Sequence, residues 1–247
     1  KHVPFCEYNP FEATKTNVIG TENMVNASLA NNVSKFLLVS TDKVVSPTSC
    51  LGATKLLAER VVINSENIKG SKKTIFACAR FGNVIGTRGS IVPYFTTQIK
   101  NNQNLTVTDS RMTRYFMTID KATEVLIESI NVMKGREIFI PRKLRLFKII
   151  DLANSLKKIY NKDNLKIKII GKRPGEKIFE NLISETEIEN VKLTKNFYVL
   201  KNNIRNNKKQ MTSVVKTLKQ SKIMSEKEIF TFLKKFIFNC YIGKDFH

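Results

Sequence analysis

The sequence is poor in the residues that most metal and disulfide sites use. Its 247 residues include two histidines, no tryptophan and four cysteines, Cys6, Cys50, Cys78 and Cys240. The cysteines share no CxxC spacing, and the histidines stand near opposite ends of the chain. This distribution excludes a conventional zinc site, so we expect no bound metal. Scattered cysteines also predict a reduced, cytoplasmic location.

Long apolar runs are missing as well. Lys, Asn or Thr interrupts each apolar stretch within a few residues, and none approaches the about 18 residues that a bilayer-spanning helix needs. We therefore predict no membrane span in this segment. Because the first residue is Lys1 and not methionine, a membrane anchor upstream of the segment stays open.

Acidic residues are only half as many as basic ones. The chain has 21 Asp and Glu against 42 Lys and Arg, a net charge of +21, which raises the question of nucleic-acid binding. The basic residues are spread over the whole chain, and the densest basic tract, residues 202–222, contains no aromatic side chain for base stacking. We predict no nucleic-acid partner. A basic pocket for an anionic substrate fits the same charge.

Helical and strand patterns alternate along the chain, which indicates an α/β domain with a mainly parallel sheet. The uninterrupted apolar run Phe36–Val39 is typical of a buried parallel strand. Predicted strands cover residues 36–39, 74–79, 105–108, 138–140 and 167–170. We predict helices over residues 10–31, 51–64, 91–100, 122–132 and 149–160, a helix opened by the segment 173–177, and a last helix capped by Ser225.

Polar residues follow the first of these strands. Thr41, Asp42 and Lys43 stand at its carboxyl end, the edge of an open α/β sheet at which ligands bind. Lys55 follows on the next predicted helix. Taken alone, Asp42–Lys43 fits a solvated turn equally well, and Lys55 fits a surface lysine.

The joint arrangement resembles a known family. In the short-chain dehydrogenase superfamily, a strand ending in Ser or Thr is followed by a helix that carries Tyr-x-x-x-Lys, and here that stretch reads Leu51-Gly-Ala-Thr-Lys55. The chain resembles the inverting UDP-N-acetylglucosamine 4,6-dehydratases and the related CapD-like polysaccharide biosynthesis proteins. The resemblance fades after Lys192. Further blocks that agree in order and spacing are His2-Val-Pro, Asn9-Pro-Phe-Glu-Ala, Lys15-Thr-Asn, Arg80-Phe-Gly-Asn-Val, Gly89-Ser-Ile-Val-Pro, Met112-Thr-Arg-Tyr-Phe-Met-Thr and Arg173-Pro-Gly-Glu-Lys.

For the fold, the resemblance implies the C-terminal part of a Rossmann-type doubly wound parallel sheet plus a small α/β substrate-binding lobe. Residues 1–90 would complete the NAD(P)-binding domain and carry the catalytic residues. Residues 91–190 would form mainly the nucleotide-sugar lobe, with some return to the sheet, and residues 191–247 a basic extension. No GxGxxG fingerprint follows a predicted strand, because the family's glycine-rich turn precedes the equivalent of Lys1. We therefore expect a fragment of a larger protein or a degraded gene copy.

For the chemistry, the resemblance implies that NAD or NADP takes hydride from C4 of the hexose and returns it to C6, while water leaves from C5 and C6. Such an elimination needs two proton-transfer groups. By resemblance Asp42 is the acid at O6 and Lys43 the base at C5, with inversion at C5. Thr41 would hydrogen-bond the C4 oxygen, and Lys55 would hold the nicotinamide ribose and disfavour the ammonium form of Lys43.

Leu51 departs from the family pattern. It stands where the superfamily has the tyrosine that accepts the C4 hydroxyl proton, and an aliphatic side chain cannot accept it. Some members related to the long, membrane-anchored branch have Met there and are still regarded as dehydratases. The base for the oxidation is therefore unassigned, with Thr41, or Lys43 acting through water, as candidates.

A UDP-sugar offers a diphosphate, whose oxygens an arginine fork matches. By resemblance Arg173 binds the diphosphate and Glu176 the uridine ribose. Asn83 and Arg114 would line the same pocket, and Lys1 would approach the phosphates or the sugar. The alternatives are a structural ion pair for either arginine and a simple turn residue for Asn83.

The expected function is therefore dehydration of UDP-N-acetylglucosamine for surface polysaccharide or glycan synthesis, by a homo-oligomer. One alternative is a UDP-sugar 4-epimerase, although epimerases rely on the tyrosine that Leu51 replaces and do not usually carry Asp-Lys at positions 42 and 43. The other is a non-catalytic remnant that binds nucleotide sugars, which the retained Thr41 and Lys55 argue against.

Overall fold

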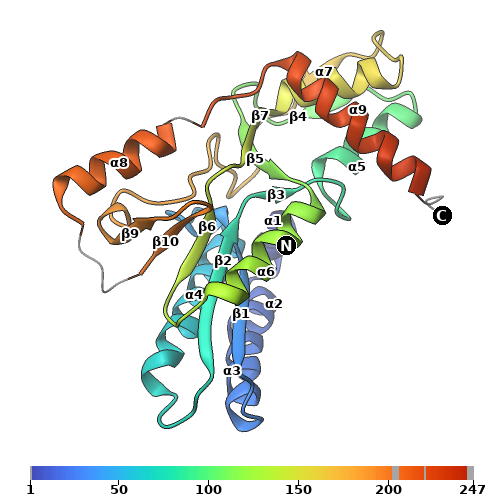
Figure 1. Cartoon of the computed structure of the whole chain (residues 1–247). Helices are drawn as coiled ribbons and strands as arrows, with labels where there is room; N and C mark the ends of the chain where they lie inside the picture. Colours follow the sequence, from blue (N-terminus) through green and yellow to red (C-terminus); the bar gives the residue numbers. More distant parts are fainter. Residues whose placement is uncertain (1, 202–205, 220, 244–247) are drawn as a thin grey trace.

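The computed structural model describes residues 2–201, 206–219 and 221–243, so Lys1, a predicted substrate ligand, lies outside the described residues. Its largest unit is a five-stranded sheet in the order β1–β2–β6–β10–β9 (Figure 1). β1, β2 and β6 are parallel, whereas β10 and β9 are antiparallel additions. The five strands are β1 (Lys35–Thr41), β2 (Ile75–Phe81), β6 (Ile138–Pro141), β9 (Val191–Leu193) and β10 (Phe197–Leu200).

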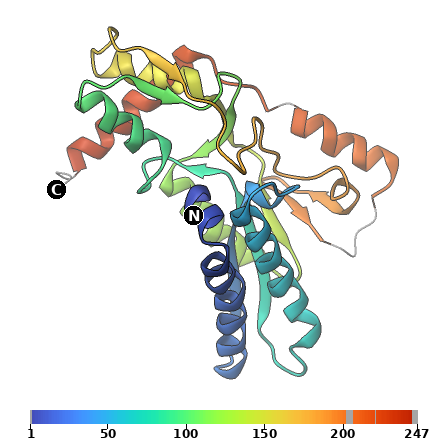
Figure 2. The same cartoon turned by 180° about the vertical axis from the view of Figure 1, so that it is seen from behind.

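Helices cover both faces of this sheet (Figures 1 and 2). Both faces need this cover because alternate residues of β2 point to opposite sides. Phe76 and Cys78 enter one hydrophobic core, and Ala77 and Ala79 enter another on the opposite face. The arrangement confirms the predicted Rossmann-type α/β fold. On one face lie α3 (Gly20–Ala30) and α4 (Cys50–Ile68), preceded by α1 (Val3–Tyr8), α2 (Pro10–Thr14) and a π-helical turn (Lys15–Ile19); on the other lies α6 (Ile119–Val132).

A smaller lobe is formed mainly by the segment that follows β2. Its core contains Phe95, Phe116, Phe147 and Ile229, which come from four different elements. The lobe consists of a sheet of β3 (Asn83–Val84), β5 (Thr113–Met117) and β7 (Arg145–Lys148), a parallel pair of β4 (Leu105–Val107) and β8 (Ile167–Ile169), and the helices α5 (Ile91–Lys100), α7 (Ile149–Ile159) and α9 (Glu226–Gly243).

The C-terminal segment contributes to both parts of the molecule. β9 and β10 extend the main sheet, α8 (Lys208–Lys219) lies beside β9, and α9 packs on α7 (Figure 1). Within the described part of the chain, no helix is long and apolar enough to cross a membrane.

Most predicted elements are present, but the helix predicted from residue 173 is wrong. Residues 173–177 form a turn, in which Gly175 adopts a φ of +77°, the left-handed region that glycine enters at little cost. The Lys177 side chain ties the turn to the main domain, because its ammonium donates to the carbonyl oxygen of Val45. The Pro-Gly-Glu pattern therefore marks a turn against the main sheet and not a helix start.

A buried ion-pair network joins the sheet to the residues that follow this turn. The guanidinium of Arg80, at the end of β2, is wholly buried and donates to Glu59 on α4 at 2.8 Å, to Glu187 at 2.9 Å and to the Leu182 carbonyl oxygen at 3.1 Å. Burial alone would lower the pKa of Arg80, but the two carboxylates outweigh it and raise that pKa. Ser40 on β1 donates to Glu59 at 2.5 Å and completes the network.

We expect Arg80→Ala to lower the free energy of unfolding by about 3–5 kcal/mol, because it leaves the Glu59 carboxylate buried without its cation. Urea unfolding followed by circular dichroism measures the change. Arg111→Ala is the control, since the Arg111 side chain is 66% exposed beside Asp109, and its loss should destabilise the fold far less than the loss of Arg80. Equal losses for the two variants would show that the Arg80 network does not stabilise the fold.

Candidate active site

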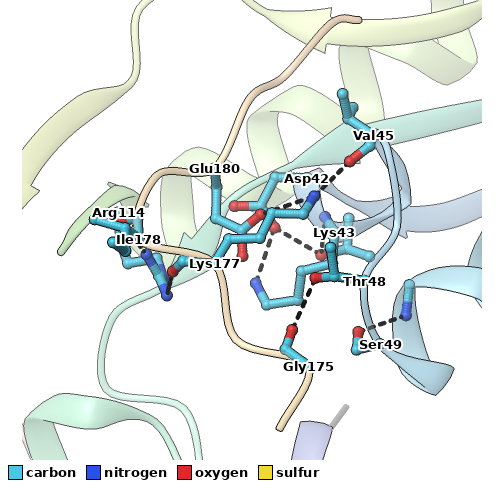
Figure 3. Close-up of polar contacts among 12 residues, drawn as sticks. Asp42, Lys43, Val45, Thr48, Ser49, Arg114, Gly175, Lys177, Ile178 and Glu180 are labelled. Carbon is cyan, nitrogen blue, oxygen red and sulfur yellow. Dashed lines mark hydrogen bonds and ion pairs between the residues drawn. The ribbon is translucent and has the colours of Figure 1, made fainter. Parts of the chain in front are cut away.

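The carboxyl end of β1 carries three side chains in mutual contact. Thr41 ends the strand, and its hydroxyl donates to Asp42 Oδ1 at 2.9 Å. Lys43 Nζ lies 2.9 Å from the same oxygen and 3.3 Å from the amide oxygen of Asn83. Figure 3 shows the Lys43 ammonium directed at Asp42. The structure therefore brings Thr41, Asp42, Lys43 and Asn83 into one cluster at the sheet edge.

The first turn of α4 packs directly against this cluster. A Cβ atom on Gly52 would lie 2.3 Å from the carbonyl oxygen of Lys43, so only glycine permits the approach. Ser49 caps the helix by accepting from the Gly52 amide at 3.1 Å. Leu51 is 3% exposed and adds an apolar wall without a proton acceptor.

Lys55 lies one turn further along α4. Its ammonium donates to the carbonyl oxygen of Val39, near the end of β1, at 3.3 Å. Burial lowers the pKa of Lys55, because the charged ammonium is partly removed from water. The structure thus places Lys55 between α4 and the strand that carries Thr41.

Two adjoining cavities open beside the cluster. The larger has a volume of about 440 Å³, within the range of small-molecule sites, and Asn83, Arg114, Arg173 and Glu176 are among the residues that line it. The smaller, of about 100 Å³, is lined by Lys43 and shares Asn83, Arg114 and Glu176 with the larger. A ligand that fills the larger cavity can therefore reach toward Lys43.

The two predicted arginines have different surroundings. Arg114 is buried, and its guanidinium donates to the carbonyl oxygens of Thr113, Lys177 and Ile178 at 2.7, 2.7 and 3.0 Å (Figure 3). It therefore holds the 173–180 segment in place and makes no structural ion pair with a described residue. The guanidinium of Arg173 is exposed and has no hydrogen-bond or ion-pair partner among the described residues.

Glu176 completes the turn that carries Arg173. Its side chain accepts a hydrogen bond from the Arg173 amide at 3.1 Å, and its own amide donates to the Arg173 carbonyl oxygen at 3.1 Å. The side chains of Arg173 and Glu176 both line the larger cavity, so the turn presents a cation and a carboxylate to the same cavity.

Two further charged residues, Lys177 and Glu180, line the smaller cavity, and sequence reasoning did not single them out. Glu180 is 7% exposed, and its side chain points toward Asp42 (Figure 3). Burial, and then the neighbouring Asp42 carboxylate, raise the pKa of Glu180. Its local sequence gives no sign of burial, because the exposed Phe179 precedes it and no helical or strand period runs through the segment.

The sequence is similar to one family model and to several known proteins. Residues 1–202 match the family model described as polysaccharide biosynthesis protein. An uncharacterized membrane protein of Methanocaldococcus jannaschii is 43% identical, over 95% of this chain and 72% of that protein. The UDP-N-acetylglucosamine 4,6-dehydratase (inverting) of Campylobacter jejuni is 40% identical, over 83% of this chain and 60% of the enzyme. A UDP-glucose 4-epimerase of Rickettsia bellii is 38% identical, over 80% and 58%.

Solved structures show the same fold. The X-ray structure of Pen from Bacillus thuringiensis is 38% identical, with a TM-score of 0.85 over 97% of this chain and 72% of that one. The dTDP-glucose 4,6-dehydratase DesIV of Streptomyces venezuelae, solved with NAD bound, is 18% identical and has a TM-score of 0.68 over 74% and 61%. At that identity the likeness shows the fold alone.

The chain spans 60% or less of the length of the dehydratase and the epimerase. The family resemblance stated from the motifs is nevertheless confirmed, since the family model covers most of the chain. The chain belongs to the polysaccharide biosynthesis protein family, and its named relatives are nucleotide-sugar dehydratases and epimerases.

Proposed function

We propose that the protein containing this chain is a 4,6-dehydratase that converts UDP-N-acetylglucosamine to a 4-keto-6-deoxy, C5-inverted UDP-sugar for polysaccharide or glycan synthesis. The observation that carries the proposal is the contact between a wholly buried carboxyl group, Asp42, and the ammonium of Lys43 at the edge of a cavity. The relative from Campylobacter jejuni, a dehydratase of this substrate, supports the choice.

Elimination of water needs a base at C5 and an acid at O6, on neighbouring carbon atoms. Lys43 lines the smaller cavity, and in its neutral form it would take the C5 proton. Asp42 lies next to it and would protonate O6. Thr41, whose hydroxyl already donates to Asp42, would bind the C4 oxygen.

The larger cavity would hold the nucleotide. Arg173 keeps its guanidinium free of protein partners among the described residues and would form a fork with the diphosphate. Glu176 would accept hydrogen bonds from the ribose hydroxyls. Asn83 and Arg114, which border both cavities, would line the passage from diphosphate to hexose.

Lys55 and Thr41 fit the nicotinamide end of NAD or NADP. The Lys55 ammonium is available beside the strand end, where its one hydrogen bond to Val39 leaves other N–H groups for ribose hydroxyls. The bound cofactor would supply the redox chemistry, taking hydride from C4 and giving it back to C6. The residues here would hold its ribose and orient the substrate.

A UDP-sugar 4-epimerase is the second candidate, favoured by the relative from Rickettsia bellii. Mass spectrometry, together with proton NMR to assign the configuration at C4, separates the two activities when the gene product containing this chain is incubated with UDP-N-acetylglucosamine and NAD or NADP. The proposal expects a product lighter by one water. A product of unchanged mass with an inverted C4 would establish the epimerase instead, and saturable UDP binding without any product would establish a binding remnant.

We expect Lys43→Ala to abolish exchange of the C5 proton with solvent deuterium, because the variant has no amine to remove that proton. UDP binding should persist, since Lys43 does not line the larger cavity. Proton NMR in deuterated water follows the exchange. Deuterium entering C5 at the wild-type rate would show that another group is the base.

We expect Arg173→Ala to weaken UDP binding by about 1.5–3 kcal/mol, the range for a hydrogen bond to a charged group. Isothermal titration calorimetry with UDP measures the loss. Arg60→Ala, which removes an exposed arginine from α4, is the charge-matched control and should leave the dissociation constant unchanged. An unchanged constant for Arg173→Ala would remove Arg173 from the site.

A further inference from the structure

Two buried carboxyl oxygens beside the cluster accept no hydrogen bond from any residue that the structure describes. They are Asp42 Oδ2 and Glu180 Oε2. The two side chains come from segments far apart in the sequence, and Figure 3 shows them pointing toward one another. A buried carboxyl oxygen that accepts no hydrogen bond is costly, so two such oxygens on side chains that face each other favour a proton between them.

The cations that face Glu180 have other acceptors. Lys177 Nζ lies 3.5 Å from Glu180 Oε2, too far for a strong hydrogen bond, and donates to the Val45 carbonyl oxygen. Lys43 binds Asp42 Oδ1 and Asn83, and Arg114 donates to backbone carbonyl oxygens.

These three cations lower the pKa of Glu180, yet burial and the Asp42 carboxylate outweigh them and the pKa is raised.

We propose that Glu180 stays protonated and supplies Asp42 Oδ2 with the hydrogen-bond donor it lacks, so that Thr41, Asp42 and Glu180 form a relay for the C4 hydroxyl proton. The inference rests on the proposed dehydratase function. Glu180 is a positioning residue in this relay, because it acts through Asp42 and not on the substrate.

The relay balances the protons of the reaction. As the cofactor that the site would hold oxidises C4, the C4 hydroxyl proton would pass to Thr41 Oγ1, and the proton of Thr41 would pass to Asp42. C4 is then a ketone and Asp42 is an acid. Lys43 next takes the C5 proton, the C5=C6 double bond forms, the C6–O6 bond breaks, and Asp42 gives its proton to the departing water. Hydride return to C6 and proton return from Lys43 to C5 restore every group.

The relay also accounts for Leu51. The tyrosine that Leu51 replaces would accept the C4 proton directly, and an apolar wall at that position leaves the proton no acceptor on α4. Thr41 is already hydrogen-bonded to Asp42 at 2.9 Å, so the alternative path exists in the ligand-free arrangement. The C4 hydroxyl proton replaces the proton of Thr41, and the proton that Thr41 gives to Asp42 is the one delivered to O6.

Infrared difference spectroscopy tests the protonated carboxyl group without substrate or cofactor. At neutral pH the gene product containing this chain should show the C=O stretch of a buried carboxylic acid, which shifts in deuterated water. Glu180→Gln should remove the band, and Glu185→Gln, which alters an exposed carboxylate on the same segment, should retain it. A band that is absent, or that survives Glu180→Gln, overturns the proposal.

Turnover separates the relay from a merely structural role. Gln is neutral and keeps a donor, so Glu180→Gln should retain most of the activity and move its alkaline decline to higher pH. Glu180→Leu lacks the donor and should lose about a hundredfold in kcat, the low end for a proton-transfer group. Thermal unfolding and UDP binding check that the variants fold.

Equal losses of kcat in Glu180→Gln and Glu180→Leu would show that Glu180 acts as an ionised partner of Lys177. That result would overturn the relay. Failure of the proposed function is distinct, because the unmodified protein would then release no dehydrated product. The infrared band would still decide whether Glu180 carries a proton, whatever the substrate.

Discussion

The site depends on one buried cation, Arg80. Its guanidinium holds Glu59 on α4 and Glu187 in the segment that follows the 173–177 turn, and Glu59 in turn holds Ser40. Ser40 directly precedes Thr41, and Arg80 lies three residues before Asn83. The end of β1, which carries the proposed proton-transfer groups, is therefore fixed to the end of β2 and to α4. A buried ion network of this kind costs desolvation, but its geometry allows only one arrangement of the three segments.

A second arginine performs the corresponding task in the smaller lobe. Arg114, on β5, donates to the carbonyl oxygens of Lys177 and Ile178 and so fixes the segment between Arg173 and Glu180. The Arg80 network holds the same segment from its other end through the Leu182 carbonyl oxygen. Arg173, which precedes the first anchor, lines the larger cavity, and Glu180, which lies between the anchors, lines the smaller one. The residues proposed for nucleotide binding and for proton transfer thus share one support.

The sequence was sufficient for the parts of the site that are local. Thr41, Asp42 and Lys43 follow a buried strand, and the strand end determines where they lie. The sequence was insufficient where position depends on distant residues. Glu180 is buried only because its segment crosses the end of β1, and Gly175 makes a turn out of residues that also fit a helix start. β9 is three residues long, too short for a period to be recognised, and the apolar run of β10 stands alone between polar residues.

A crystal structure of the gene product containing this chain with UDP-N-acetylglucosamine tests the central claim most directly. The claim is that one nucleotide sugar occupies both cavities. We predict the diphosphate beside Arg173, the uridine in the larger cavity, and the C4 oxygen of the hexose within hydrogen-bond distance of Thr41. A hexose that points into solvent, or a diphosphate away from Arg173, would contradict the account.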